Sequence, residues 1–124
     1  MAAQAQPNYL ANKDCDVRTI QLNTAIEAGY AVGYDGNLPV AGGSIQGILR
    51  YGGEAGDHVP CTTSNTASAI VGAVVTNGQD LAVDGAGKLI PAVSGNLIVA
   101  RALDDSGAAD LYITVELKTE SIKA

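Results

Sequence analysis

The sequence predicts a small all-β domain, built as a β-barrel or a β-sandwich, with an extended N-terminal arm. Three observations predict this fold class. Glycine, asparagine and aspartate cluster about every eight to twelve residues from Val17 onward, which is the turn spacing of sandwiches and barrels. Apolar and polar residues alternate in several short segments, as in strands with one buried face. The chain of 124 residues suits one domain, which we place at residues 17–118.

Residues 1–16 show neither helical nor strand periodicity, and we expect them to form the arm. Two interpretations are open: a frayed terminus without a role, and a segment that becomes ordered against a partner. In the second, Tyr9 and Leu10 are the apolar anchors. The candidate contact residues of the arm are Gln4, Pro7, Tyr9, Leu10 and Lys13.

Three strands are expected in the first half of the domain. Ile20, Leu22 and Ile26 lie at even spacing with polar residues between them, which predicts a strand that ends at residues 27–29. Residues 44–51 form a second candidate strand and residues 58–63 a third. Pro60 cannot donate a hydrogen bond to a neighbouring strand, so we expect the third strand at a sheet edge.

The second half gives clearer patterns. Residues 66–75 are rich in β-branched side chains, which favours a strand over a helix capped by Asn65. Residues 81–83 and 88–90 predict a hairpin in which Gly85 and Gly87 adopt positive φ. Residues 97–100 are apolar on both sides, as in a strand covered on both faces. Residues 111–118 alternate, with the odd-numbered side chains buried, and residues 119–124 are expected to form a loose polar tail.

Composition favours assembly between subunits. Apolar residues make up 47% of the chain and aromatic residues only 4%, so the core must consist of small aliphatic side chains. Charged residues make up 16%, below the usual level of about 25%. A thin core and a weakly charged surface predict further burial between copies of the chain.

The sequence argues against several classes of protein. The longest apolar runs fall far short of the roughly 20 residues of a membrane helix, and the N-terminus lacks the pattern of a signal peptide. The net charge of −6 provides no basic surface for nucleic acid or anionic lipid. Cys15 and Cys61 are expected as free thiols of a cytoplasmically made protein, with a bridged pair as the alternative.

Few residues of the sequence could take part in catalysis or bind a ligand. We predict that the chain is not an enzyme and that it binds neither a metal nor a cofactor. His58 is the single histidine; Asp57 and Cys61 are its nearest candidate partners, but residues 58 and 61 of a strand point to opposite faces. Gly87 and Lys88 do not complete a phosphate-binding loop, because Ala82 and Leu89 replace the required residues.

Acidic residues and one arginine complete the candidates. Asp104, Asp105 and Asp110 surround a loop of small residues, where aspartates usually form turns. Arg101 shares the expected core face of its strand with Leu97, Val99 and Leu103. It must therefore reach solvent at the rim or pair with a carboxylate, and a salt bridge across a subunit interface is our sharper hypothesis.

The C-terminal third combines several motifs in a fixed order: a hairpin that ends in Gly87-Lys88, a Pro-Ala at 91–92, an apolar strand that ends in Ala-Leu at 102–103, an acidic loop of small residues, and a closing strand after Asp110. In this combination it resembles the capsid cement, or head decoration, proteins of tailed bacteriophages. The resemblance covers about 40 residues well and about 90 loosely, whereas residues 1–16 lie outside it. Arg101 and Ala109 depart from the pattern, because glycine is usual at both positions.

The resemblance implies a trimeric β-domain on the outer surface of the phage head, made in the bacterial cytoplasm. It would bind the major capsid protein, bridge neighbouring capsid subunits and resist the pressure of packaged DNA. The arm through Tyr9 and Leu10 would then contribute to capsid docking. The alternative is a virion-associated adhesion or fibre module that binds a host surface glycan.

Overall fold

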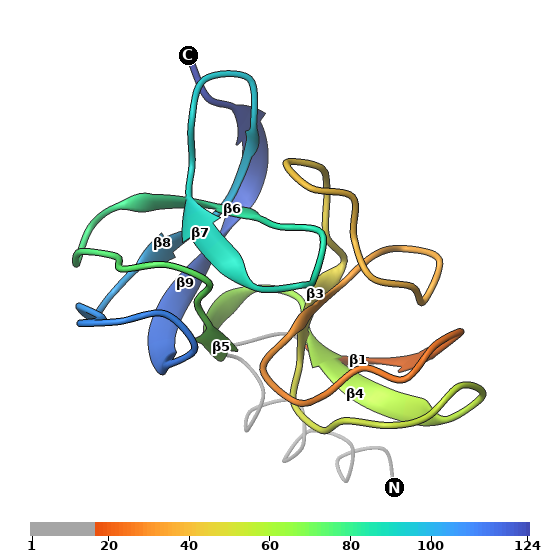
Figure 1. Cartoon of the computed structure of the whole chain (residues 1–124). Helices are drawn as coiled ribbons and strands as arrows, with labels where there is room; N and C mark the ends of the chain where they lie inside the picture. Colours follow the sequence, from red (N-terminus) through yellow and green to blue (C-terminus); the bar gives the residue numbers. More distant parts are fainter. Residues whose placement is uncertain (1–16) are drawn as a thin grey trace, which may run out of the picture.

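The computed structural model describes residues 17–124, which form nine strands in two antiparallel sheets (Figure 1). The first sheet has the order β1-β4-β3-β2 and the second the order β5-β9-β8-β6-β7. The strands of the first sheet are β1 (Val17–Gln21), β2 (Ala31–Val32), β3 (Gly47–Leu49) and β4 (His58–Thr62). Those of the second are β5 (Asn65–Ile70), β6 (Asp80–Val83), β7 (Leu89–Pro91), β8 (Leu97–Ala102) and β9 (Tyr112–Ile122).

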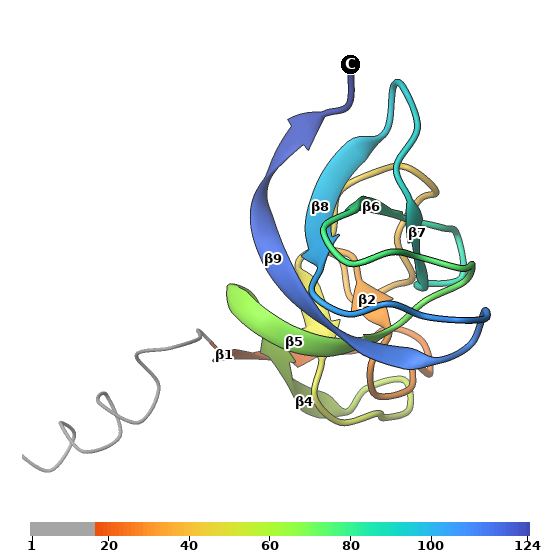
Figure 2. The same ribbon diagram turned by 90° about the vertical axis from the view of Figure 1, so that its left-hand side faces the viewer.

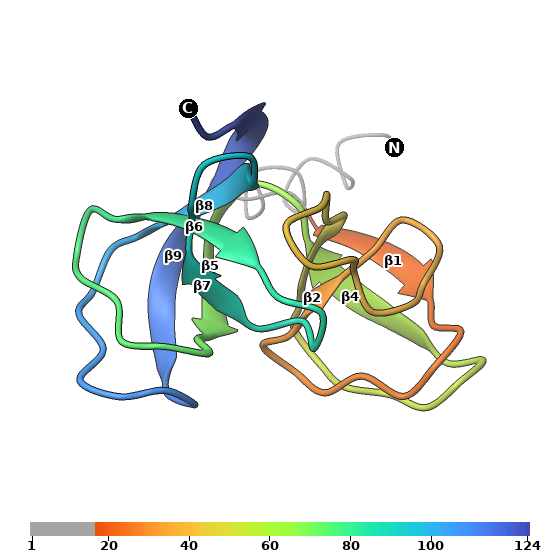
Figure 3. The same ribbon diagram turned by 45° about the horizontal axis from the view of Figure 1, so that its top comes forward.

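The predicted all-β class is confirmed, but the sheets do not close into a barrel. The two sheets lie side by side in Figure 3, with β1 to β4 on one side and β5 to β9 on the other. The long, curved strand β9 lies between β5 and β8 in the second sheet (Figure 2). Residues 17–124 contain no helix that could cross a lipid bilayer.

The core consists of two clusters of small aliphatic side chains, as the composition predicts. The larger cluster joins the second sheet to Ala31, Ile45 and Ile48 of the first half. The smaller one lies on the other side of the first sheet and contains Leu49 and Cys61. Ile48 and Leu49 are consecutive residues of β3 and point to opposite faces, so this strand contributes to both clusters.

The buried face of the first predicted strand agrees with the sequence pattern. Ile20, Leu22 and Ile26 are buried, although β1 ends at Gln21 and Ile26 makes only an isolated bridge to Gly53. The hairpin is confirmed, since Val83 pairs with Leu89. The candidate strands 44–51 and 66–75 shorten to β3 and β5, and Asn65 begins β5 with a φ of 61° rather than capping a helix.

The predicted edge position of Pro60 is wrong, because β4 lies between β1 and β3. The carbonyl of Pro60 accepts a hydrogen bond from the Arg50 N–H at 3.0 Å. The nitrogen and the carbonyl of one strand residue point to the same side, so the Pro60 nitrogen also faces β3. The β3–β4 ladder ends one residue earlier, at the pair Leu49–Cys61. The hydrogen-bond donor that Pro60 lacks would therefore lie just beyond the end of the β3–β4 ladder. The pairing of β4 with β1 is not affected by the proline.

Three further details of the second sheet correct the predictions. Gly87 has a φ of 87°, but Gly85 does not adopt positive φ, because Asp84 closes the turn by accepting hydrogen bonds from Ala86 and Lys88. Leu111 precedes β9 and is 46% exposed rather than buried. The strand does not end at residue 118: β9 continues to Ile122, which pairs with Leu97 after an irregularity between Ile98 and Ala100.

Candidate functional site

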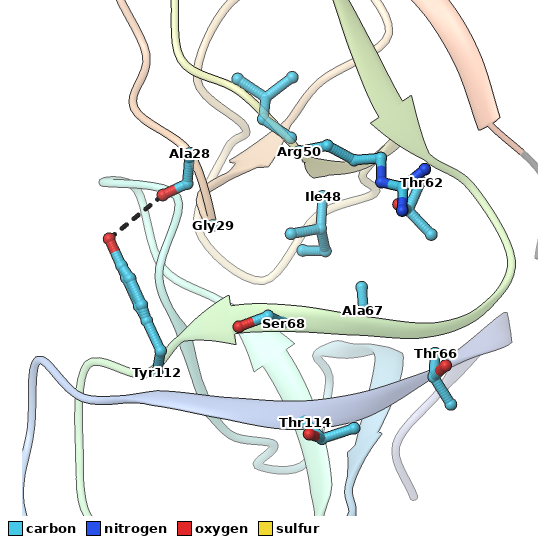
Figure 4. Close-up of a pocket in the computed structure, with 11 residues that line it drawn as sticks. Ala28, Gly29, Ile48, Arg50, Thr62, Thr66, Ala67, Ser68, Tyr112 and Thr114 are labelled. Atoms are coloured by element: carbon cyan, nitrogen blue, oxygen red, sulfur yellow. Dashed lines mark hydrogen bonds between the residues drawn. The ribbon is translucent and has the colours of Figure 1, made fainter.

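A groove lies between the two sheets of residues 17–124. It has a volume of about 540 Å³ and opens to solvent along β5. Figure 4 shows Ile48 and Ala67 pointing toward each other across its floor, while Arg50 extends toward Thr62. Its lining residues come from both sheets: Ala28, Gly29, Ile48, Leu49, Arg50, Thr62, Thr66, Ala67, Ser68, Tyr112 and Thr114.

At one end of the groove, hydrogen bonds and a close packing contact join the two halves of the molecule. The hydroxyl of Tyr112, on β9, donates a hydrogen bond of 3.2 Å to the carbonyl of Ala28 (Figure 4). A β-carbon on Gly29 would lie 3.4 Å from the Tyr112 ring, and Gly29 has a φ of 86°. The Ile70 N–H also donates to the Gly29 carbonyl at 3.0 Å. No pattern in the sequence predicted this junction, because its partners lie 41 to 84 positions apart.

Arg101 lies on the outer face of the second sheet, not on the core face that alternation predicted. Its guanidinium lies 3.6 Å from the carboxylate of Asp80 on β6, and both side chains are partly exposed. Its backbone partner on β9 is Glu116. Arg101 thus pairs with a carboxylate of its own chain, and the subunit-interface hypothesis remains a prediction.

The candidate residues of the arm lie outside the described part of the chain. Gln4, Pro7, Tyr9, Leu10 and Lys13 all precede Val17, as does Cys15. The described chain begins at Val17, which pairs with Thr62, a residue that lines the groove.

His58 and Cys61 are separated, as strand geometry predicts. His58 is exposed at the start of β4, whereas Cys61 is a buried free thiol in the smaller core cluster. Burial raises the pKa of the Cys61 thiol to about 11, and the nearby positive charge of Arg18 only partly opposes this shift. A protonated, enclosed thiol is a poor nucleophile.

The acidic loop residues have structural roles. Asp105 accepts a hydrogen bond from the Asn77 N–H at 2.7 Å, and Asp104 accepts one from the Thr114 N–H at 3.1 Å. Asp110 has a φ of 65° and pairs with Lys88 at 2.5 Å, and this hydrogen bond raises the pKa of Lys88. Within residues 17–124, no three His, Cys, Asp or Glu side chains are grouped so as to hold a metal ion.

Comparison with known proteins identifies the fold. The sequence matches no known protein family and no curated protein. Its structure is similar to the crystal structure of the head fiber gp8.5 N base in bacteriophage phi29, with a TM-score of 0.70 and 11% sequence identity. The similarity covers 89% of this chain and 99% of that chain. The two chains therefore share an all-β fold over nearly their whole lengths.

Proposed function

We propose that this chain is a structural protein of the bacteriophage head that binds the outer surface of the mature capsid as a decoration, or cement, protein. The observation that carries the proposal is the fold that it shares with the phi29 head fiber base. The resemblance of residues 80–115 to head decoration proteins supports the same role from the sequence alone. In this role the chain bridges neighbouring copies of the major capsid protein and needs no catalytic activity, cofactor or metal.

Multivalency makes docking by a short arm effective. An arm that buries a few hundred Å² binds weakly once the entropy of ordering it is subtracted. In a homotrimer, the second and third arms bind almost intramolecularly, which raises avidity by about 10²–10⁴-fold. We propose that Tyr9 and Leu10 are the anchors and that Gln4, Pro7 and Lys13 flank them. The net charge of −6 suits a surface that faces away from packaged DNA.

Sedimentation with capsids tests the proposal. The purified protein is mixed with undecorated mature heads of its own phage, and the bound copies are counted. We expect saturation at a fixed number of copies per head and better survival of heated heads. Failure to bind any head state would reject a decoration role.

Two arm variants examine the docking site in the same experiment. Tyr9→Ser combined with Leu10→Ser should weaken head binding at least about tenfold, because each copy of the trimer loses its anchors. Ala2→Ser combined with Ala3→Ser changes the same arm without removing an anchor and should bind like the wild type. Equal binding by both variants would remove Tyr9 and Leu10 from the docking site.

A fibre or adhesion module is the second candidate, because the fold shared with a head fiber base does not distinguish such a module from a decoration protein. Such a module would bind a host surface glycan. Adsorption of the purified protein to host cells, with competition by soluble cell-surface glycan, separates the two functions. Saturable adsorption without binding to heads would favour the adhesion module.

A further inference from the structure

Strand β5 has one open edge. The Val71 N–H donates to Leu111 at 3.0 Å on the β9 side, whereas the Ile70 N–H donates to Gly29 at 3.0 Å on the opposite side. Backbone groups alternate between the two sides of a strand, so those of Thr66 and Ser68 point the same way as those of Ile70. Nothing in residues 17–124 forms a backbone hydrogen bond with Thr66 or Ser68 on that side.

The open edge forms one wall of the groove between the sheets. Thr66 and Ser68 line it, Ala67 and Ile48 provide apolar floor, and Arg50 lies at its Thr62 end (Figure 4). An unpaired edge beside an apolar floor is the arrangement by which sheets accept an additional extended strand.

The other sheet edges are less suited to accept a strand. β7 ends in Pro91, and the Leu89 carbonyl already accepts a hydrogen bond from Gly72 at 2.8 Å. β2 has two residues, of which Ala31 donates to Gly87 at 2.8 Å. β1 is open, but charged and polar side chains, including Arg18, surround it. Natural sheets block open edges with such features, and β5 carries neither proline nor charge.

We propose that residues 1–16 of the same molecule cover the open edge of β5, pairing as an added strand with Thr66 and Ser68. The described chain starts at the groove, because Val17 pairs with Thr62. Sixteen extended residues reach at most about 55 Å, and the six residues of β5 span about 20 Å. A segment tethered so close has an effective concentration in the millimolar range, which favours it over a second copy.

Charge and apolar content also fit this occupant. Asp14 and Asp16 directly precede Val17, and the Arg50 side chain extends toward Thr62 at this end of the groove (Figure 4). Tyr9 and Leu10 are adjacent, so in an added strand one faces the floor at Ile48 and Ala67 while the other faces solvent. The inference concerns the free protein and does not rest on the proposed function. Where both hold, the groove and the capsid compete for the same anchors.

Residue-resolved amide hydrogen exchange on the free full-length chain tests the proposal. We expect the amides of Thr66 and Ser68 to exchange at least about 100-fold more slowly than unprotected amides, independently of protein concentration. Tyr9→Ser combined with Leu10→Ser should restore fast exchange at these two positions. The amides of Ala67 and Ala69 face β9 and should stay protected in both proteins, as an internal control. Ala2→Ser combined with Ala3→Ser should leave all four amides unchanged.

Three results would overturn the proposal. Fast exchange of Thr66 and Ser68 in the wild type would show an uncovered edge. Protection that increases with protein concentration would assign the cover to a second copy. Protection that survives the double substitution would exclude the arm anchors. The exchange experiment contains no capsid, so none of these results decides whether the protein binds phage heads. The sedimentation experiment tests that function separately.

Discussion

Gly47 allows β3 to approach β4 closely. A β-carbon at this position would lie 2.6 Å from the Cys61 sulfur and closer still to the Thr62 carbonyl oxygen, although the Gly47 backbone has no positive φ. We expect Gly47→Ala to lower the free energy of unfolding by about 2 kcal/mol through overpacking. Gly107→Ala is the matched control, since a β-carbon there meets nothing within 4 Å. Urea midpoints measure both, and equal midpoints would contradict the steric argument.

Cys61 should make the protein less stable at alkaline pH. An unfolded cysteine ionises near pH 9, whereas burial raises the pKa of Cys61 to about 11 in the folded chain. Between these values the folded state retains a proton that the unfolded state has lost. Stability is therefore unaffected by this group below pH 9 and decreases toward pH 11, by at most about 1.4 kcal/mol per pH unit.

The measurement compares urea midpoints of the wild type and Cys61→Ala at pH 7.5, 9 and 10. The variant should be less stable at pH 7.5, because it leaves a small cavity, but its stability should decrease less steeply with pH. Cys15 is present in both proteins and cancels from the comparison. Parallel pH profiles would show that Cys61 ionises equally in both states.

Tyr112 connects the two sheets, which makes it the most informative side chain at the scale of elements. Tyr112→Phe removes the hydroxyl that donates to Ala28 but keeps the ring beside Gly29. We expect a loss of about 0.5–1.5 kcal/mol, the usual contribution of such a hydrogen bond. Tyr51→Phe serves as the control, because Tyr51 is 68% exposed. Equal urea midpoints for the two variants would mean that the hydrogen bond adds nothing to the junction.

Alternation in the sequence predicted which faces of the strands are buried, but not which strands are neighbours. Ile113 and Val115 are buried as predicted, because the period of two is a local property. The central position of Pro60 depends on β1 and β3 pairing on either side of it, which no local pattern encodes. The extension of β9 to Ile122 depends likewise on its distant partner Leu97.

The candidate site was predictable only in part, for the same reason. The sequence identified Arg101 as an unusual charge but placed it on the core face with Val99. The register irregularity in β8 puts both Val99 and Ala100 in the core, so Arg101 lies on the outer face. The groove combines residues from β3, β5 and β9 and depends on the order of the strands. Thr66 and Ser68 become an open edge only because β5 ends the second sheet.

Arg101 connects the molecule to its expected assembly. A cross-strand row on the outer face of the second sheet joins Thr66, Glu116, Arg101 and Asp80, each the backbone partner of the next. Arg101 is the only cation in this row, so in the expected assembly it would reduce the repulsion between this face and the acidic surface of another copy. The pair with Asp80 is partly exposed and contributes at most about 1 kcal/mol to the fold.

Charge reversal should therefore affect assembly more than folding. We expect the wild type to sediment as a trimer and Arg101→Glu to dissociate at concentrations where the wild type remains assembled, with a urea midpoint close to that of the wild type. Lys118→Glu is the matched control, because Lys118 lies on the neighbouring strand with a similarly exposed side chain. A wild-type monomer would contradict the trimer, and an Arg101→Glu trimer would place the interface elsewhere. Dissociation by Arg101→Glu alone would locate the interface at Arg101 itself, since Lys118 lies on the same face, 3.7 Å from Glu116, and both variants change the net charge equally.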